Sequence, residues 1–126
     1  MTIPTEDSLK QLQQKLQAFV DERDWAQFHS PKNLAMAMIV EAAELVEHFQ
    51  WSTESESHEL SAEKREAVGY ELADTFVYLL RISQVLNIDL IEAANAKIIL
   101  NAQKYPVEKA RGKNNKYADY QNQKDV

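Results

Sequence analysis

The stretch LAMAMIVEAAELVEHF, residues 34–49, decides the fold, because it combines a helical hydrophobic repeat with a closely spaced pair of carboxylates, Glu41 and Glu44. The apolar residues recur every three or four positions, as on one face of an amphipathic helix, at Leu34, Met38, Ala42, Leu45 and Phe49. Glu41 and Glu44 interrupt this stretch at a spacing of i,i+3, which places both acids on one face of the helix. The stretch therefore predicts a helix that carries an acidic pair within apolar surroundings.

A second acidic pair follows in the sequence ELAD, residues 71–74, where Glu71 and Asp74 have the same spacing. Leu72, Ala73 and Phe76 surround this pair with apolar sequence. If the two helices pack side by side, four carboxylates converge, and their mutual repulsion is tolerable only with protons, solvent or a cation. All-oxygen ligation suits Mg²⁺ and also Mn²⁺. The sequence predicts a divalent-metal site built from Glu41, Glu44, Glu71 and Asp74.

With the remaining sequence included, four helices and no strand are predicted. Helical periodicity covers residues 9–20, and the acidic stretch extends as a helix from Pro31, behind an N-cap at Ser30, to about Trp51. Ser61 and Asp89 are N-caps for helices that reach about residues 86 and 105, and a polar loop is expected at residues 52–60. The prediction is an all-α four-helix bundle. Residues 1–106 are expected to form the domain, and residues 107–126 a basic polar tail.

Composition restricts the class of protein. The 126 residues include no cysteine and carry a net charge of −6. The charge is uneven, since residues 1–96 hold 17 acids and 7 bases whereas residues 97–126 hold 3 acids and 7 bases. The acidic body argues against nucleic acid as the main partner. With no signal peptide and no apolar run that could span a bilayer, we expect a soluble cytoplasmic protein without a membrane partner.

Other interpretations of the acids are available. A ferritin-like di-iron site requires Glu-x-x-His on two helices, and Ala26, Leu45 and Ser55 stand three residues before the histidines, so this class is excluded. The four acids could instead lie at the solvent-exposed edge of the apolar helix face, or form ion pairs with Arg81 or Lys64.

Two further groups fit a phosphorylated, metal-bound ligand. Aromatic side chains that could stack on a nucleobase, or simply fill the ends of the bundle, are Trp25, Phe28, His29, Trp51 and Tyr78. Lys97, Asn101 and Lys104 follow one another at i, i+4 and i+7 and could face phosphates. Alone, such a polar stripe is equally typical of a solvated helix surface.

These motifs together resemble a known family. ERDW at 22–25 with FH at 28–29, the stretch from Glu41 to EHFQW ending at 51, ELAD at 71–74, and KYP at 104–106 are similar to the all-α nucleoside triphosphate pyrophosphohydrolases. Within them, the chain resembles the MazG-like branch that includes the dCTP pyrophosphatases. Val40 stands where longer-motif members have an additional Glu. The resemblance covers residues 8 to 117.

The resemblance implies hydrolysis of a deoxynucleoside triphosphate, such as dCTP, to its monophosphate and pyrophosphate in the sanitation of the nucleotide pool. It implies Mg²⁺ on the four acids, a base pocket from the five aromatic positions, and Lys97, Asn101 and Lys104 near the nucleotide. Glu41 or Glu44 would activate the attacking water, and Lys109, Arg111 or Lys113 could assist the leaving pyrophosphate. A homodimer or homotetramer is implied as well. The alternative is a helical regulatory module that binds nucleotide without cleaving it.

Overall fold

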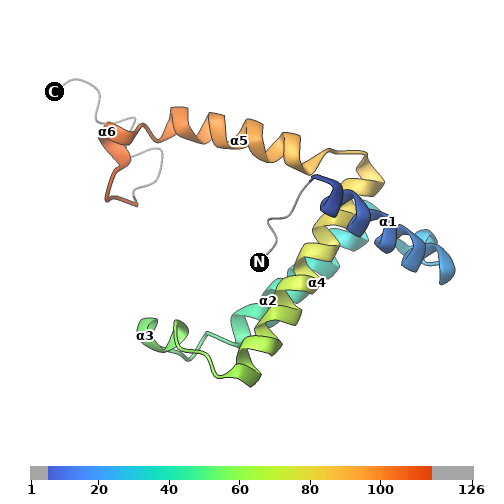
Figure 1. Cartoon of the computed structure of the whole chain (residues 1–126), viewed down its shortest axis with the longest axis horizontal. Helices are drawn as coiled ribbons and strands as arrows, with labels where there is room; N and C mark the ends of the chain where they lie inside the picture. The colour runs from blue at the N-terminus through green and yellow to red at the C-terminus, as the bar shows by residue number, and fades with distance from the viewer. Residues whose placement is uncertain (1–5, 115–126) are drawn as a thin grey trace. The chain divides into compact units, whose positions relative to one another are not determined.

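The computed structural model describes residues 6–114, and this part of the chain contains helices and no strand (Figure 1). The four long helices are α1 (Glu6–Glu22), α2 (Pro31–Glu47), α4 (Ala62–Leu86) and α5 (Leu90–Lys104). Three short ones are the 3-10 helix η1 (Ala26–Phe28), α3 (Glu54–Ser57) and α6 (Val107–Ala110). The all-α prediction is confirmed, and all four expected helices form.

The helices begin where local capping signals place them. At the starts of α2, α4 and α5, a backbone N–H of the first turn donates to the cap side chain, over 3.1, 3.2 and 3.0 Å to Ser30, Ser61 and Asp89. These bonds satisfy N–H groups that have no partner inside the helix. Proline at the first position of α2 adds a preset φ angle. All three predicted N-caps are confirmed.

One helix boundary and one expected loop differ from the prediction. Helix α2 ends at Glu47 and not near Trp51, because the chain enters a turn in which the N–H groups of Phe49 and Gln50 both donate to the carbonyl of Val46, over 2.9 and 2.8 Å. The expected loop at 52–60 contains α3, which Thr53 caps by accepting from the N–H of Glu56 over 3.1 Å. The expected tail begins with α6, and its residues 115–126 lie outside the described part of the chain.

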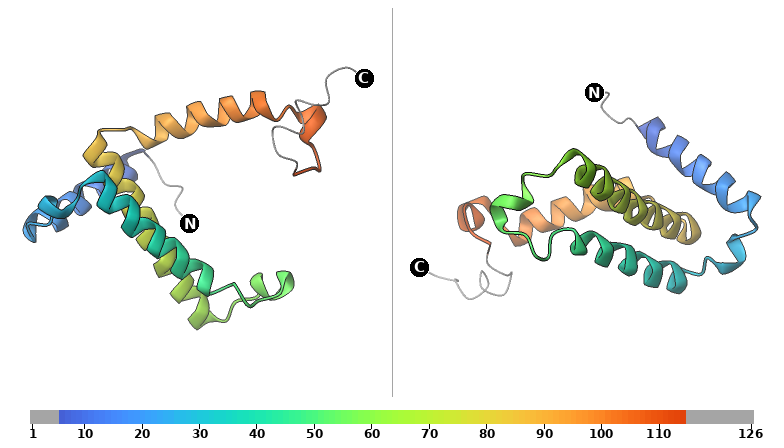
Figure 2. Two further views of the ribbon diagram at one scale, coloured as in Figure 1. Left: turned by 180° about the vertical axis from the view of Figure 1, so that it is seen from behind. Right: turned by 90° about the horizontal axis from the view of Figure 1, so that it is seen from below.

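Helices α2 and α4 form the main helix pair, and Figure 2 shows them side by side in both views. The chain runs along α2, turns through α3 and returns along α4, so both acidic pairs lie on neighbouring helices. Helix α1 packs more lightly against α4. Between Ile88 and Asp89 the chain divides into two compact units, of which the first holds α1 to α4 and the second α5 and α6.

The buried apolar core of the described residues is small. It consists of Val20, Leu34, Val68 and Leu80, which come from α1, α2 and α4. Many large apolar side chains are exposed instead, including Ile39 at 63% and Val46 at 57% on α2. Beside these two residues, α2 borders an apolar groove of about 450 Å³. Among the described residues, no helix combines the length and hydropathy that a bilayer crossing requires.

Candidate metal centre and nucleotide site

Three carboxylates meet where α2 and α4 pack together. Glu41 and Glu44 come from α2 and Glu71 from α4, and one oxygen from each lies within 4.8 Å of those of the other two. All three side chains are half-buried. The i,i+3 spacing on α2 gives two acids on one face, and the hairpin brings the third to them. The predicted convergence of the two acidic helices is therefore observed for three of the four acids.

The cluster is electrostatically strained in the absence of a cation. Burial, a hydrogen bond with Glu44 and the charges of neighbouring acids raise the pKa of Glu41 to about 7. Burial and the charge of Glu44 are also the main causes that raise the pKa of Glu71. A buried carboxyl beside other carboxylates resists ionisation because its charged form loses hydration and gains repulsion.

One oxygen of the cluster lacks any partner. Oε2 of Glu71 is shielded from solvent and has no hydrogen-bond partner. Buried acceptor atoms almost always have a hydrogen-bond partner, so an unpartnered oxygen indicates a site for a donor or a cation. Three convergent carboxylates with one orphaned oxygen fit a hard divalent cation, which takes oxygen ligands.

The described part of the chain offers these acids no basic partner. Arg81, considered above as their possible partner, bonds instead to His29, Gln17 and Gln84. Arg23 forms an ion pair with Glu22, outside the cluster. Pairing of the acids with Arg81 is therefore wrong as an explanation of the cluster.

Asp74 lies at the edge of the cluster. Its side chain is exposed, and it is not among the three acids whose oxygens converge. It is nevertheless close enough for its charge to raise the pKa of Glu41 and of Glu71. Its role as a fourth ligand stays a prediction.

The aromatic candidates lie at three places in the first unit. Trp25 and Phe28 belong to the η1 segment and are 43% and 60% exposed, whereas Trp51, beyond the end of α2, is 88% exposed. Tyr78 is half-buried on α4, one turn after Asp74. The exposed rings of Trp25, Phe28 and Trp51 are available for stacking on a base.

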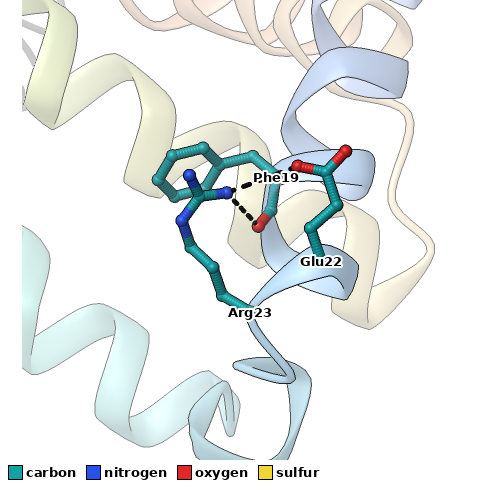
Figure 3. A network of polar contacts seen from close by, with 3 residues as sticks. All are labelled: Phe19, Glu22 and Arg23. Atoms are coloured by element: carbon teal, nitrogen blue, oxygen red, sulfur yellow. Dashed lines mark hydrogen bonds and ion pairs between the residues drawn. The ribbon is translucent and has the colours of Figure 1, made fainter.

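The end of α1 holds Trp25 in place. The ring of Trp25 meets the ring of Phe19 edge-on, with centroids 5.6 Å apart. On the Phe19 ring lies the guanidinium of Arg23, 3.8 Å from its centroid (Figure 3). Arg23 also donates to the carbonyl of Phe19 over 3.0 Å and pairs with Glu22 at 3.6 Å. These contacts fix the C-terminal turn of α1 and thereby the start of the η1 segment.

The polar stripe belongs to the second unit. Lys97, Asn101 and Lys104 are exposed on α5 at the predicted spacing. Their contact with substrate stays a prediction.

Sequence reasoning did not find the role of Arg81 as the centre of a polar network. This side chain is 5% exposed, and it follows Asp74 and Tyr78 on α4 at i+7 and i+3. That helical register was the available signal. Its partners His29 and Gln17 are 52 and 64 residues away in sequence, so no local pattern points to them.

The chain is similar in sequence and in fold to known proteins. The chain matches the MazG-like family over residues 36–120. It is 37% identical over 118 residues to dCTP pyrophosphatase 1 of Mus musculus, a match that spans 92% of this chain and 68% of the mouse protein. The Homo sapiens protein of the same name is 36% identical over 118 residues, with the same coverage. A crystal structure of a pyrophosphatase from Archaeoglobus fulgidus is similar with a TM-score of 0.76 and 36% identity, over 84% of this chain and 99% of that one.

Proposed function

Because the chain belongs to the MazG-like family, we propose that it hydrolyses dCTP or a related deoxynucleoside triphosphate to the monophosphate and pyrophosphate. The observation that carries the proposal is the convergence of Glu41, Glu44 and Glu71, with one shielded and unpartnered oxygen. Two relatives named dCTP pyrophosphatase 1 support the substrate class. Cleavage at the α-phosphorus removes a nucleotide from the pool without leaving a diphosphate, which suits a role in nucleotide sanitation.

The acids would hold a divalent cation, Mg²⁺ or alternatively Mn²⁺, with Asp74 as a fourth ligand. When bound, such a cation would stabilise the negative charge that develops on the phosphate oxygens during hydrolysis. Glu41 or Glu44 orients the attacking water and accepts its proton.

The remaining candidate residues form two groups, one expected to contact the nucleobase and the other the phosphates. Trp25, Phe28, Trp51 and Tyr78 provide faces on which a base stacks, and His29 provides a polar atom beside them. Lys97, Asn101 and Lys104 would meet the phosphates, with Lys109, Arg111 or Lys113 assisting the leaving pyrophosphate. We place the catalytic domain at residues 1–106 and the tail at 107–126, and we place the protein in the cytoplasm, where its substrates are made.

The reaction type is tested by incubating the protein with each deoxynucleoside triphosphate and Mg²⁺ in oxygen-18-labelled water. We expect dCTP to give dCMP and pyrophosphate, with the label in dCMP, because water attacks the α-phosphorus. A diphosphate and orthophosphate as products, or label in the pyrophosphate, would contradict this reaction. Saturable binding of dCTP without turnover under Mg²⁺ or Mn²⁺ would favour the non-catalytic regulatory module.

We propose further that the protein works as a homodimer or homotetramer. The groove on α2 is lined by Ile39, Ala42, Ala43, Val46, Glu47 and Gln50. Exposed apolar surface on this scale, beside so small a core, is typical of an interface between protein chains.

Sedimentation should therefore give a mass that is a multiple of 14.5 kDa. A Val46→Glu variant places a charge in the apolar groove, and we expect its dissociation constant to rise by about tenfold or more. The control is Glu63→Gln on α4, which changes an exposed charge outside the groove. A monomeric wild-type chain at micromolar concentration would contradict the assembly.

A further inference from the structure

Arg81 is a buried cation with no acidic partner in its network. Its Nε–H donates to Nδ1 of His29 over 3.0 Å, and its Nη1 donates to Oε1 of Gln17 over 2.6 Å and to Oε1 of Gln84 over 3.2 Å. Gln84 in turn donates to the backbone carbonyl of Gln13 over 2.8 Å. The network thus connects α1, the residue after η1, and α4. All of its acceptors are neutral atoms.

The bond from Arg81 determines the protonation of His29. A guanidinium has donors and no acceptor, so Nδ1 of His29 must present a lone pair to Nε–H. A neutral imidazole with Nδ1 as acceptor carries its proton on Nε2. Burial and then the nearby charge of Arg81 lower the pKa of His29, which is consistent with a neutral ring.

The protonated nitrogen of His29, Nε2, is free to donate a hydrogen bond to a ligand. Within the described part of the chain Nε2 of His29 has no hydrogen-bond partner, and it is not among the buried polar atoms that lack one, so it keeps contact with solvent. His29 is half-buried, and Arg81, its anchor, lies one turn from Tyr78 and two turns from Asp74 on the same face of α4. Arg81 lies ten residues after Glu71, about 15 Å along the helix. An extended nucleoside triphosphate can span that length from the acids.

We propose that Arg81 is a positioning residue that fixes His29 with Nδ1 as acceptor and Nε2–H as a donor to an acceptor atom of the nucleobase. The proposal rests on the proposed function, because it assumes that a nucleotide lies between the acids and the η1 segment. The ring of cytosine presents acceptors at O2 and N3, and a fixed donor matches such an edge. Arg81 itself contacts His29 and not the substrate.

The tautomer of His29 is measured by long-range nitrogen–proton NMR spectra of the full chain at neutral pH. In the wild type we expect the pattern of a neutral ring protonated on Nε2. The Arg81→Met variant removes the donor to Nδ1, and the pattern should then change to a mixture of the two tautomers. His29→Asn and His58→Asn identify the signals by their loss. A wild-type ring protonated on Nδ1, or an unchanged tautomer in Arg81→Met, would overturn the proposal.

The His29→Asn variant tests the donor role of Nε2 separately from the bond between Arg81 and Nδ1. This test does not depend on the stability of the Arg81→Met variant. The Asn Oδ1 can take the place of Nδ1 and accept from Arg81, but the shorter side chain has no N–H donor at the position of Nε2. We expect KM for dCTP to rise about tenfold, the value of one hydrogen bond, with kcat changed less than about twofold. The matched control, His58→Asn, changes an exposed histidine outside the network and should leave both constants unchanged.

The outcomes separate this proposal from the proposed function. An unchanged KM in His29→Asn, with normal turnover, would show that His29 serves only to anchor the chain and would overturn the donor role. Absence of turnover with any deoxynucleoside triphosphate in the wild type would overturn the proposed function and, with it, the contact to the base. The NMR result would still decide whether Arg81 fixes the ring.

Discussion

The Glu41→Gln variant is expected to lose dCTP turnover by about 100-fold or more while it keeps its helical fold. Glu41 is the acid of the cluster whose pKa is raised to about 7, and its carboxylate is either the base for the attacking water or a ligand of the cation. A glutamine amide has nearly the same shape, but it neither accepts the proton nor carries the charge. Loss of a general base alone costs about 100-fold to 10,000-fold.

Initial rates of pyrophosphate release from dCTP at saturating Mg²⁺ give the measurement, and circular dichroism checks the fold. Glu66→Gln is the matched control, because Glu66 is exposed on α4 and bonds to the hydroxyl of Tyr70 over 3.2 Å, outside the cluster. The control should stay within about threefold of the wild type. Equal rates in Glu41→Gln and Glu66→Gln would remove the cluster from the catalytic site.

Helix starts could be predicted from the sequence because their causes are local. Ser30, Ser61 and Asp89 each accept a hydrogen bond from a backbone N–H within their own first turn, and such caps depend on a few neighbouring residues. The end of α2 was predicted too late, because apolar register does not show where a helix stops. The competing signal was present in TESE, residues 53–56, whose Thr-x-x-Glu spacing is that of a capping box. In the structure the Thr53 hydroxyl accepts from the N–H of Glu56 and donates to its Oε1.

In the candidate site, too, the features with local causes could be predicted from the sequence, and the features that depend on packing between distant segments could not. The i,i+3 spacing of Glu41 and Glu44 follows from helix geometry, so their common face could be predicted. The contact with Glu71 required only that neighbouring helices pack as a hairpin, and it too was foreseen. The network of Arg81 could not be, because its partners lie on α1 and after η1, and the pairing is decided by how those segments dock.

A divalent cation is expected to stabilise the wild-type protein strongly, and more so at pH 8 than at pH 5. The folded chain holds Glu41 with a pKa of about 7, against 4.5 in the unfolded chain. Between these values the folded state binds more protons, so the contribution of Glu41 to stability is present below pH 4.5 and is lost as the pH rises through about 7. The pKa of Glu71 is raised and acts in the same direction. The ionised cluster at pH 8 therefore weakens the fold until a cation compensates it.

At pH 8, Mg²⁺ at about 100 times its dissociation constant should stabilise the protein by about 2.7 kcal/mol, which raises Tm by roughly 10 °C. Glu71→Gln removes one charge and one oxygen ligand, so two opposite results are expected from the same substitution. Without metal its Tm at pH 8 should lie a few degrees above that of the wild type, because repulsion falls. With Mg²⁺ its Tm should hardly change, whereas the Glu66→Gln control should keep the full increase. Thermal unfolding in EDTA and in Mg²⁺ measures both, and an undiminished Mg²⁺ response in Glu71→Gln would contradict a metal site at this oxygen.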